Sequence, residues 1–178
     1  MEREEAGRLV ETYGQAVYRL AYARTASRED AEDIVQETFL RLVRKSPEFR
    51  DAEHCRAWLL RVAANCAGDL LRSSWRRRTR PLEEAGALTV PEPEVREDGA
   101  VAAVLALPER YRTVIHLFYY EEMSVAEIAS ILGQREGTVR TRLSRGRSML
   151  RQMLEEKGGE THVSYRVSRG DGADYAER

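Results

Sequence analysis

Arginine and hydroxyl side chains are interleaved between residues 134 and 151, and this combination can bind DNA. The stretch has six arginines and one acidic residue, Glu136, a local excess of five positive charges. Arginine pairs with guanine edges and with phosphates, and threonine and serine hydroxyls can bond either group. A solvated face of a small helical bundle is the alternative. The small residues between the arginines favour a helix whose polar face contacts DNA.

Two predicted helices and a tight turn position this face. Ser124 and Glu127 have the S-x-x-E spacing of a capping box, which predicts a helix that ends at Gly133. A second helix is predicted over about 137–150, with its inner face formed by Val139, Leu143, Gly146 and Leu150. Two helices joined by a short turn that contains glycine, the second of them basic, are typical of a helix-turn-helix that binds the major groove.

The N-terminal part of the chain predicts three helices, over about 3–24, 28–45 and 52–77. Ser27 and Asp30 have capping-box spacing at the start of the second. Its predicted inner stripe is Ala31, Ile34, Val35, Thr38 and Leu42. Phe39 and Leu40 widen the apolar band beyond this stripe, which indicates either tight packing or a surface for a partner. Periodicity alone favours packing.

The third of these helices has a polar and aromatic side apart from its core stripe. The residues on that side are Trp58, Arg61, Asn65, Asp69, Arg72, Ser73 and Arg76. Arginines bind phosphates, an amide can pair with a base edge, and an aromatic ring can stack on an unpaired base. The alternative is that Trp58 belongs to the core and the arginines after residue 75 only stabilise a helix end. The residues alone favour neither interpretation.

Charge is segregated along the chain, although the formal net charge of its 178 residues is only −1. Any affinity for nucleic acid must therefore come from local patches. Residues 81–98 hold six acids and one arginine without a helical period, which predicts a flexible linker. Two more helices are predicted after it, over about 99–107 and 108–122.

The expected fold class is all-α, with two small helical domains joined by this acidic linker. The second domain is expected to be a helix-turn-helix, a winged-helix-like unit of four helices without the wing. The expected boundaries are 1–78 for the first domain, 79–99 for the linker, 100–156 for the second domain and 157–178 for a disordered tail.

Residues that could form an active site or a metal site are scattered. Histidines stand only at positions 54, 116 and 162 and there is no Gly-rich phosphate loop, so an enzyme is not expected and no cofactor is predicted. Cys55 and Cys66 lie about three turns apart on one predicted helix, which predicts reduced packing residues. His54 beside Cys55 supplies too few ligands for zinc. The charged start and the lack of a long apolar run predict a cytoplasmic protein without membrane insertion.

Two stretches together resemble one family. The first comprises residues 30–42 (DAEDIVQETFLRL) and 57–72 (AWLLRVAANCAGDLLR), and the second runs over 107–150, from LPERYRTVIHLF to LSRGRSML. They are similar to the two modules of a bacterial extracytoplasmic-function (ECF) sigma factor, the compact branch of the sigma-70 family. The second stretch alone is less specific, because E-G-T-V-R openings also occur in response regulators. Both stretches in this order, with an acidic linker between them, support the resemblance.

The resemblance implies a protein that binds core RNA polymerase and promoter DNA, with residues assigned to three surfaces. Core polymerase would be bound by Asp33, Gln36, Glu37 and Leu40. The minus-10 element would be opened and recognised by Phe49, Trp58, Arg61, Asn65, Asp69, Arg72 and Arg76, with the loop 46–54 capturing a flipped base. The minus-35 duplex would be bound by Arg135, Thr138, Arg140, Thr141, Ser144, Arg145 and Arg147. The resemblance also implies an anti-sigma factor as a partner.

A free-standing dimeric helix-turn-helix repressor is the alternative function. It predicts palindromic duplex sites that are bound without polymerase. It offers no role for Trp58 or Asn65, so the promoter-specificity subunit is the expected function.

Overall fold

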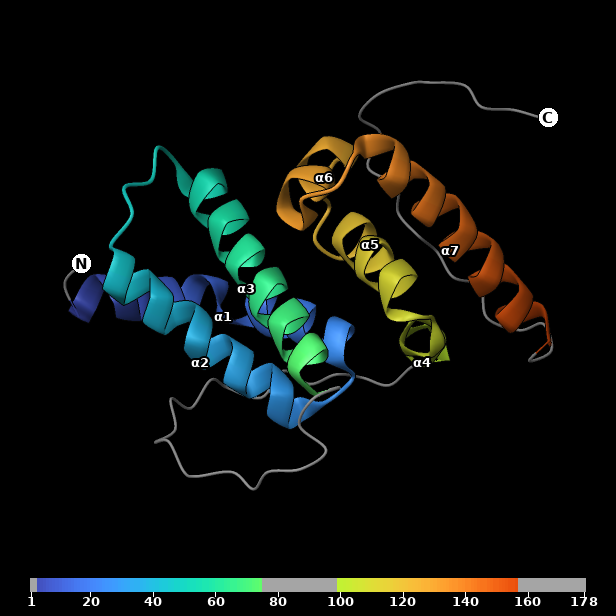
Figure 1. The fold of residues 1–178 in the computed structure, drawn as a ribbon, viewed down its shortest axis with the longest axis horizontal. Helices are drawn as coiled ribbons and strands as arrows, with labels where there is room; N and C mark the ends of the chain where they lie inside the picture. The colour runs from blue at the N-terminus through green and yellow to red at the C-terminus, as the bar shows by residue number, and fades with distance from the viewer. Residues whose placement is uncertain (1–2, 75–98, 157–178) are drawn as a thin grey trace.

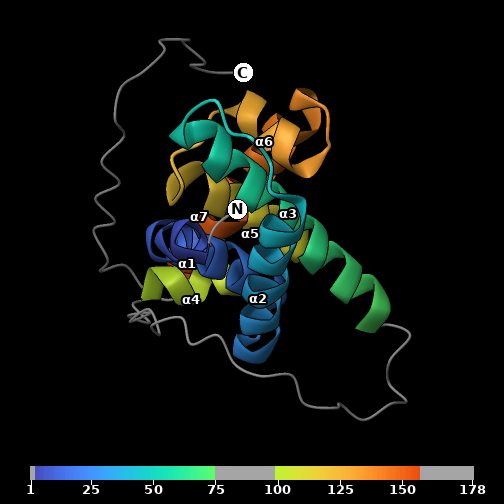
Figure 2. The same cartoon turned by 90° about the vertical axis from the view of Figure 1, so that its left-hand side faces the viewer.

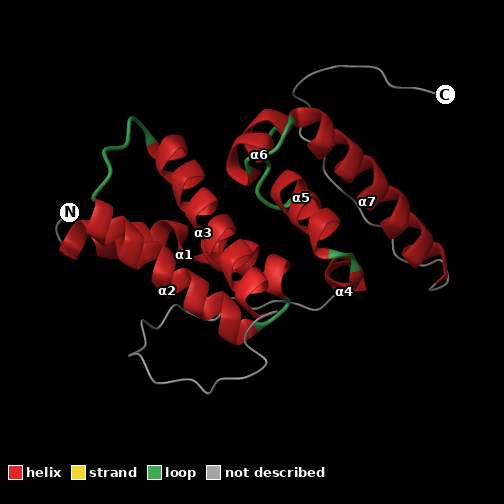
Figure 3. Cartoon of the chain, viewed as in Figure 1, coloured by secondary structure: helices red, strands yellow, loops and turns green. Residues whose placement is uncertain are grey.

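The structure, a computed structural model, describes residues 3–74 and 99–156. This part of the chain consists of helices and short loops without a strand (Figure 3), which confirms the all-α prediction. The helices are α1 (Arg3–Thr25), α2 (Arg28–Lys45), α3 (Ala52–Ser74), α4 (Gly99–Ala106), α5 (Glu109–Tyr119), α6 (Val125–Leu132) and α7 (Glu136–Glu156). Three predicted features lie outside the described residues: Arg76, the tail over 157–178, and the linker over 79–99 except for its last residue, Gly99.

The first helical group consists of α1, α2 and α3, which pack against one another (Figure 1). Ser27 caps the start of α2, because its hydroxyl accepts a hydrogen bond from the amide of Asp30. Ser46 is the C-cap residue of the helix and has a left-handed backbone conformation with a φ of 41°. Every residue of the predicted inner stripe of α2 is buried, and Phe39 is buried with them. Leu40 is 41 % exposed, so only one of the two residues that widen the apolar band belongs to the core.

The second helical group consists of α4 to α7 and contains the predicted helix-turn-helix. Ser124 and Glu127 make both hydrogen bonds of the capping box at the start of α6, as predicted. Gly133 is the C-cap residue of α6. Its φ of 62° lies in the left-handed region, which glycine adopts without strain. Pro108 is the N-cap residue that precedes α5 rather than part of its first turn. Val139 and the other predicted inward residues of α7 are buried or partly buried.

The two helical groups pack against each other, with α5 beside α1 and α6 beside α3 (Figure 1, Figure 2). Their buried apolar residues form one connected core that runs from α1 to α7. The sequence predicted two domains on a linker without this contact. Periodicity shows which face of a helix is apolar, but it does not show which distant helix covers that face.

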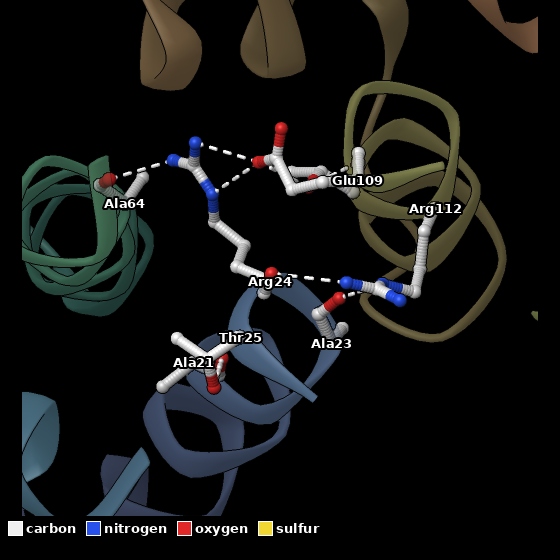
Figure 4. Close-up of polar contacts among 8 residues, drawn as sticks. Ala21, Ala23, Arg24, Thr25, Ala64, Glu109 and Arg112 are labelled. Carbon is white, nitrogen blue, oxygen red and sulfur yellow. Dashed lines mark hydrogen bonds and ion pairs between the residues drawn. The ribbon is translucent and has the colours of Figure 1, made fainter. Parts of the chain in front are cut away.

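Arg112 of α5 is buried where the two groups meet (Figure 4). Its guanidinium donates to the carbonyl oxygens of Ala23 and Arg24 in the last turn of α1, and at 2.6 Å to the carbonyl oxygen of Leu105 in α4. The last carbonyls of a helix lack partners within the helix and carry partial negative charge, so a cation there is stabilising. Arg112 therefore caps the C-terminal ends of two helices from different groups.

Arg24 makes a second set of contacts between the groups (Figure 4). Its side chain pairs with the carboxylate of Glu109 on α5 at 2.7 Å, and its Nη1 donates to the carbonyl oxygen of Ala64 on α3 at 2.6 Å. One arginine thus joins α1, α3 and α5 at the edge of the shared core.

Gly146 sets the separation of α7 and α5. A Cβ atom at this position would lie 3.0 Å from Cγ1 of Ile115 and 3.5 Å from Cβ of Tyr111. We expect Gly146→Ala to lower the free energy of unfolding by about 1–3 kcal/mol, because the Ile115 side chain that must give way is itself 1 % exposed and closely packed. Urea unfolding followed by circular dichroism measures this change.

Gly137→Ala is the matched control on the same helix. Nothing lies within 4 Å of the Cβ atom that this substitution adds. Because alanine favours helix over glycine, we expect a stabilisation of less than about 1 kcal/mol. Similar destabilisation by both substitutions would contradict the packing argument for Gly146.

Candidate nucleic-acid interface

All predicted DNA-contacting residues of the helix-turn-helix are exposed on α7 or just before it. They are Arg135, Thr138, Arg140, Thr141, Ser144, Arg145 and Arg147. The structure brings three of them together, because Thr138, Thr141 and Arg145 line a hollow of about 410 Å³ between α5 and α7. We call it the arginine hollow, and its remaining lining residues are Arg110, Tyr111, Gly137 and Arg142.

The arginine hollow is strongly basic. Arg110, Arg142 and Arg145 line it and no acidic residue does. The guanidinium of Arg110 lies 4.8 Å from the ring centre of Tyr111. A hydrogen bond with Arg145 lowers the pKa of the Tyr111 hydroxyl, against the smaller opposing effect of burial. A hollow lined by three arginines and no acidic residue has the charge to hold an anion.

Sequence reasoning missed four residues of the arginine hollow, namely Arg110, Tyr111, Gly137 and Arg142. The signal for Arg142 was present, since it lies in the arginine-rich stretch at one turn from Thr138 and Arg145. Arg110 and Tyr111 lie far away in the sequence, on α5. Only the packing of α5 against α7 reveals them as neighbours.

Two predicted residues of α7 have partners away from the hollow. Arg140 pairs with Glu136 one turn earlier, at 2.7 Å. Arg147 donates to the hydroxyl of Tyr119 at 2.7 Å, and its guanidinium lies 5.2 Å from the ring centre of Phe118. Arg147 is therefore held against α5, at the side of α7 rather than at the centre of its polar face.

The predicted polar side of α3 is also exposed. We define the α3 face as Arg61, Asn65, Asp69 and Arg72, all exposed at helical spacing. Asp69 and Arg72 form an ion pair at 2.5 Å. Arg61 donates to the hydroxyl of Ser130 in α6, so one end of the α3 face touches the other helical group. Arg76, the last predicted residue of this side, lies outside the described residues.

Phe49 and Trp58 form an aromatic pair beside the α3 face. Their ring centres are 5.8 Å apart in an edge-on arrangement, and both residues are partly buried against the core. Trp58 therefore contacts the core and also keeps part of its surface exposed. Asp51 accepts a hydrogen bond from the amide of His54 at 2.6 Å, and α3 begins at Ala52, as predicted. The last residues of the segment 46–54 that the family resemblance assigns to base capture therefore belong to the first turn of α3.

The predicted polymerase-binding residues share one side of α2. Asp33 and Leu40 are exposed, and Gln36 and Glu37 are partly buried. Glu37 pairs with Arg41 at 2.6 Å. Val43, which sequence reasoning missed, is 46 % exposed and lies one turn after Leu40, so it extends the apolar part of this side.

The two cysteines of the chain lie inside the first helical group. Cys55 and Cys66 are free and buried, as predicted, and burial raises the pKa of both thiols. No group of three or more potential metal ligands occurs in residues 3–74 and 99–156. Within those ranges, no helix is long and apolar enough to cross a membrane.

Comparison with known families separates the functional alternatives. The family model for sigma-70 region 2 matches residues 9–77, and that for sigma-70 region 4 matches residues 100–150. The chain belongs to the sigma-70 family. Region 2 corresponds to the first helical group and region 4 to the second, so the family match includes both candidate DNA surfaces.

Two relatives show which type of sigma-70 protein this is. The ECF RNA polymerase sigma factor SigW of Bacillus subtilis is 35% identical over 164 residues, which cover 83% of this chain and 88% of SigW. The ECF RNA polymerase sigma factor SigE of Mycolicibacterium smegmatis is 35% identical over 165 residues, which cover 88% of this chain but only 64% of SigE. This sigma-70 protein is an RNA polymerase sigma factor of the ECF type, and nothing in the comparisons supports the repressor alternative.

Solved structures show the same fold. The sigma factor RpoE of Bartonella quintana, in complex with the anti-sigma factor NepR, superimposes with a TM-score of 0.67 at 22% identity over 85% of this chain and 98% of that chain. CnrH, in complex with the cytosolic domain of CnrY, gives a TM-score of 0.60 at 24% identity over 88% of this chain and 92% of that chain. The sigma-70 fold of this chain therefore has close counterparts in solved structures.

Proposed function

We propose that this sigma factor directs promoter-specific initiation through three surfaces. The exposed side of α2 binds core RNA polymerase, the α3 face and the aromatic pair bind the opened minus-10 element, and α7 with the arginine hollow binds the minus-35 duplex. The supporting observation is that one chain presents two differently built polar surfaces. Aromatic rings beside a polar helix suit unpaired bases, whereas a basic recognition helix suits a major groove.

Transcription with purified components tests this proposal. Core RNA polymerase and the intact chain would be incubated with fragmented genomic DNA, and the start sites of the transcripts would be mapped. We expect transcripts that share two upstream sequence elements and that core polymerase alone does not make. Failure of the chain to bind core polymerase would refute the proposal, and duplex binding at palindromic sites without polymerase would point to the repressor function.

Substitutions of Arg145 and Arg142 distinguish base recognition from phosphate binding. We expect Arg145→Ala to weaken the free energy of binding to the correct minus-35 duplex by about 1–3 kcal/mol. Binding to unrelated duplexes should weaken much less, because the loss of a base contact affects only sequences that carry that base. Arg142→Ala, at the edge of the same hollow, should weaken binding to all sequences and reduce the salt dependence. Fluorescence anisotropy at several salt concentrations measures both effects. An equal loss on all sequences for Arg145→Ala would reassign Arg145 to phosphate.

A substitution at Leu40 tests whether the exposed side of α2 binds polymerase. We expect Leu40→Ser to weaken binding of core polymerase by about 1–2 kcal/mol, because an exposed leucine gains most from being covered by a partner. The fold should be unaffected, since the side chain lies outside the core. Lys45→Ser, an exposed change at the end of the same helix, is the control and should bind normally. Unchanged affinity in both variants would exclude Leu40 from the interface.

We also propose region 2 over residues 1–78, a linker over 79–99, region 4 over 100–156 and a tail over 157–178. The chain acts in the cytoplasm, has no catalytic activity of its own, and is regulated by an anti-sigma factor. The anti-sigma proposal is supported by the family resemblance and by the exposed Leu40 and Val43, which a competitor of polymerase could cover. Co-expression with a candidate anti-sigma segment should give a complex that no longer binds core polymerase.

A further inference from the structure

Tyr111 of α5 lies where α5 packs against α7 (Figure 1), and it lines the arginine hollow. Only 7 % of its surface is exposed. A Cβ atom added at Gly146 would lie 3.5 Å from Cβ of Tyr111, so the backbone of α7 passes close to this residue. Arg145, the residue before Gly146, lines the same hollow. The close approach of the two helices therefore brings the tyrosine of α5 to the base of the Arg145 side chain.

Two arginines contact different parts of Tyr111. The guanidinium of Arg110 lies 4.8 Å from the ring centre, where the face of an aromatic ring attracts positive charge. Arg145 donates a hydrogen bond to the hydroxyl, and this bond is the largest cause of the lowered pKa of Tyr111. Tyr111 thus holds Arg145 from a fixed point on another helix.

The other polar groups near Arg145 have partners of their own or carry the same charge. None of the described residues that line the hollow is acidic. The hydroxyl of Thr141 donates to the carbonyl oxygen of Gly137 at 2.9 Å, within α7 itself. The carboxylate of Glu136, in the first turn of α7, is paired with Arg140 at 2.7 Å. The tyrosine hydroxyl is therefore the acceptor that fixes where the Arg145 guanidinium lies.

A fixed guanidinium is an advantage for recognising a base. An exposed arginine has many conformations, and ordering one of them costs conformational entropy. A guanine edge needs the guanidinium plane in a single orientation, because two N–H groups donate to it together. A bond made before DNA arrives restricts the side chain in advance, so less entropy is lost on binding. Since a guanidinium has five N–H donors, one bond to a tyrosine leaves enough of them for the base.

We propose that Tyr111 is a positioning residue for minus-35 recognition, whose hydroxyl holds the Arg145 guanidinium in the orientation that contacts a base. The proposal rests on the proposed function of α7. Tyr111 acts through Arg145 rather than on the DNA itself, and Arg110 holds the ring from its face. The sequence preference at one base pair of the minus-35 element therefore depends on a residue of α5.

Promoter fragments with a randomised minus-35 region test this role on the intact chain bound to core polymerase. The fragments would come from the start-site mapping, and the bound ones would be sequenced. The position at which Arg145→Ala loses its preference identifies the base pair that Arg145 contacts. We expect Tyr111→Phe to lower the preference at that position by about three- to tenfold, because it removes one hydrogen bond and keeps the ring. Preferences at the other positions should stay, whereas a general loosening of α7 would lower them all.

Tyr119→Phe is the matched control. It removes a hydroxyl from the same helix, one that accepts a hydrogen bond from Arg147 at 2.7 Å at the side of α7. It should keep the preference at the Arg145 position. Tyr111→Phe combined with Arg145→Ala should lose no more preference than Arg145→Ala alone, because the hydroxyl acts only through Arg145. A further loss in the combined variant would overturn the positioning role.

Titration of the tyrosines by NMR tests the bond without DNA. With isotopically labelled tyrosine, the signal of Tyr111 is the one that Tyr111→Phe removes. We expect the pKa of Tyr111 to lie below its ordinary value of 10.0 in the unchanged chain and to rise on Arg145→Gln. If Arg145→Gln leaves the pKa of Tyr111 unchanged, the bond does not exist in solution and the proposal is wrong.

The outcomes distinguish the positioning role from the proposed function. Equal preference at the Arg145 position in Tyr111→Phe and in the unchanged chain would overturn the positioning role and leave the proposed function standing. An unchanged chain that binds core polymerase but prefers no sequence in the minus-35 region would refute the proposed function of α7, and the positioning role with it.

Discussion

Replacing Arg112 with methionine is expected to lower the free energy of unfolding by about 3 kcal/mol. Methionine fills a similar volume but donates no hydrogen bond, so the carbonyl oxygens of Ala23 and Leu105 lose a charged donor. A buried acceptor left without its partner costs about 1–3 kcal/mol, and more than one acceptor is affected here. Urea unfolding followed by circular dichroism measures the loss, which should appear as an earlier midpoint.

Arg110→Met is the control for this prediction. Arg110 lies on the same helix two residues earlier and is exposed, so its substitution should change stability by no more than about 0.5 kcal/mol. Equal midpoints for the two variants would show that the contacts of Arg112 do not stabilise the docked structure. A lower midpoint for Arg112→Met alone would confirm that one guanidinium supports both helix ends.

Acid is expected to destabilise the protein through Glu121. Burial acts to raise the pKa of this carboxyl group, but His116, Arg19 and Arg56 together outweigh burial and lower the pKa from 4.5 to about 2. Nε2 of His116 is 3.4 Å away and makes no hydrogen bond, so we attribute most of the lowering to the two arginines.

The sign of the pH dependence follows from that lowered pKa. A carboxyl group whose pKa is lower in the folded state stabilises it fully above its unfolded pKa, here about 4.5, and the contribution is lost as the pH falls toward about 2. The loss amounts to roughly 3 kcal/mol at most. Chemical unfolding at a series of pH values between these limits measures it.

Glu121→Gln should flatten this pH dependence. Glutamine cannot ionise, so the variant should be less stable than the unchanged chain at neutral pH and more nearly equal to it near pH 2. Glu122→Gln, at an exposed position, should keep the steep acid dependence. A Glu121→Gln variant with the same acid dependence as the unchanged chain would show that other carboxyl groups are responsible.

Local signals in the sequence predicted the helices and the surfaces on them. Ser124 and Glu127 predicted the start of α6 because a capping box depends only on residues three apart. The inner stripe of α2 followed from its period, and the exposed residues of α3 and α7 followed because they lie off the apolar face. Such features need no knowledge of the rest of the chain.

The contacts between the groups could not be predicted in the same way. Arg110 and Arg112 are the same residue type two positions apart, yet Arg110 is exposed at the arginine hollow and Arg112 is buried against the end of α1. Glu121 and Glu122 are adjacent, and only Glu121 meets arginines from α1 and α3. Glu121 rather than Glu122 is buried because of its contacts with α3 and α1, whose arginines lie 65 and 102 residues away in the sequence. No periodicity in a single sequence carries that information.

The shared cap at Arg112 has a consequence for work with pieces of the molecule. A truncated chain that stops before α5 lacks this guanidinium, so the terminal turn of α1 would fray into water. Polymerase affinity measured on such a fragment would reflect a loosened scaffold as well as the binding surface itself. Polymerase binding by region 2 is therefore better measured on the intact chain, in which Arg112 still caps α1.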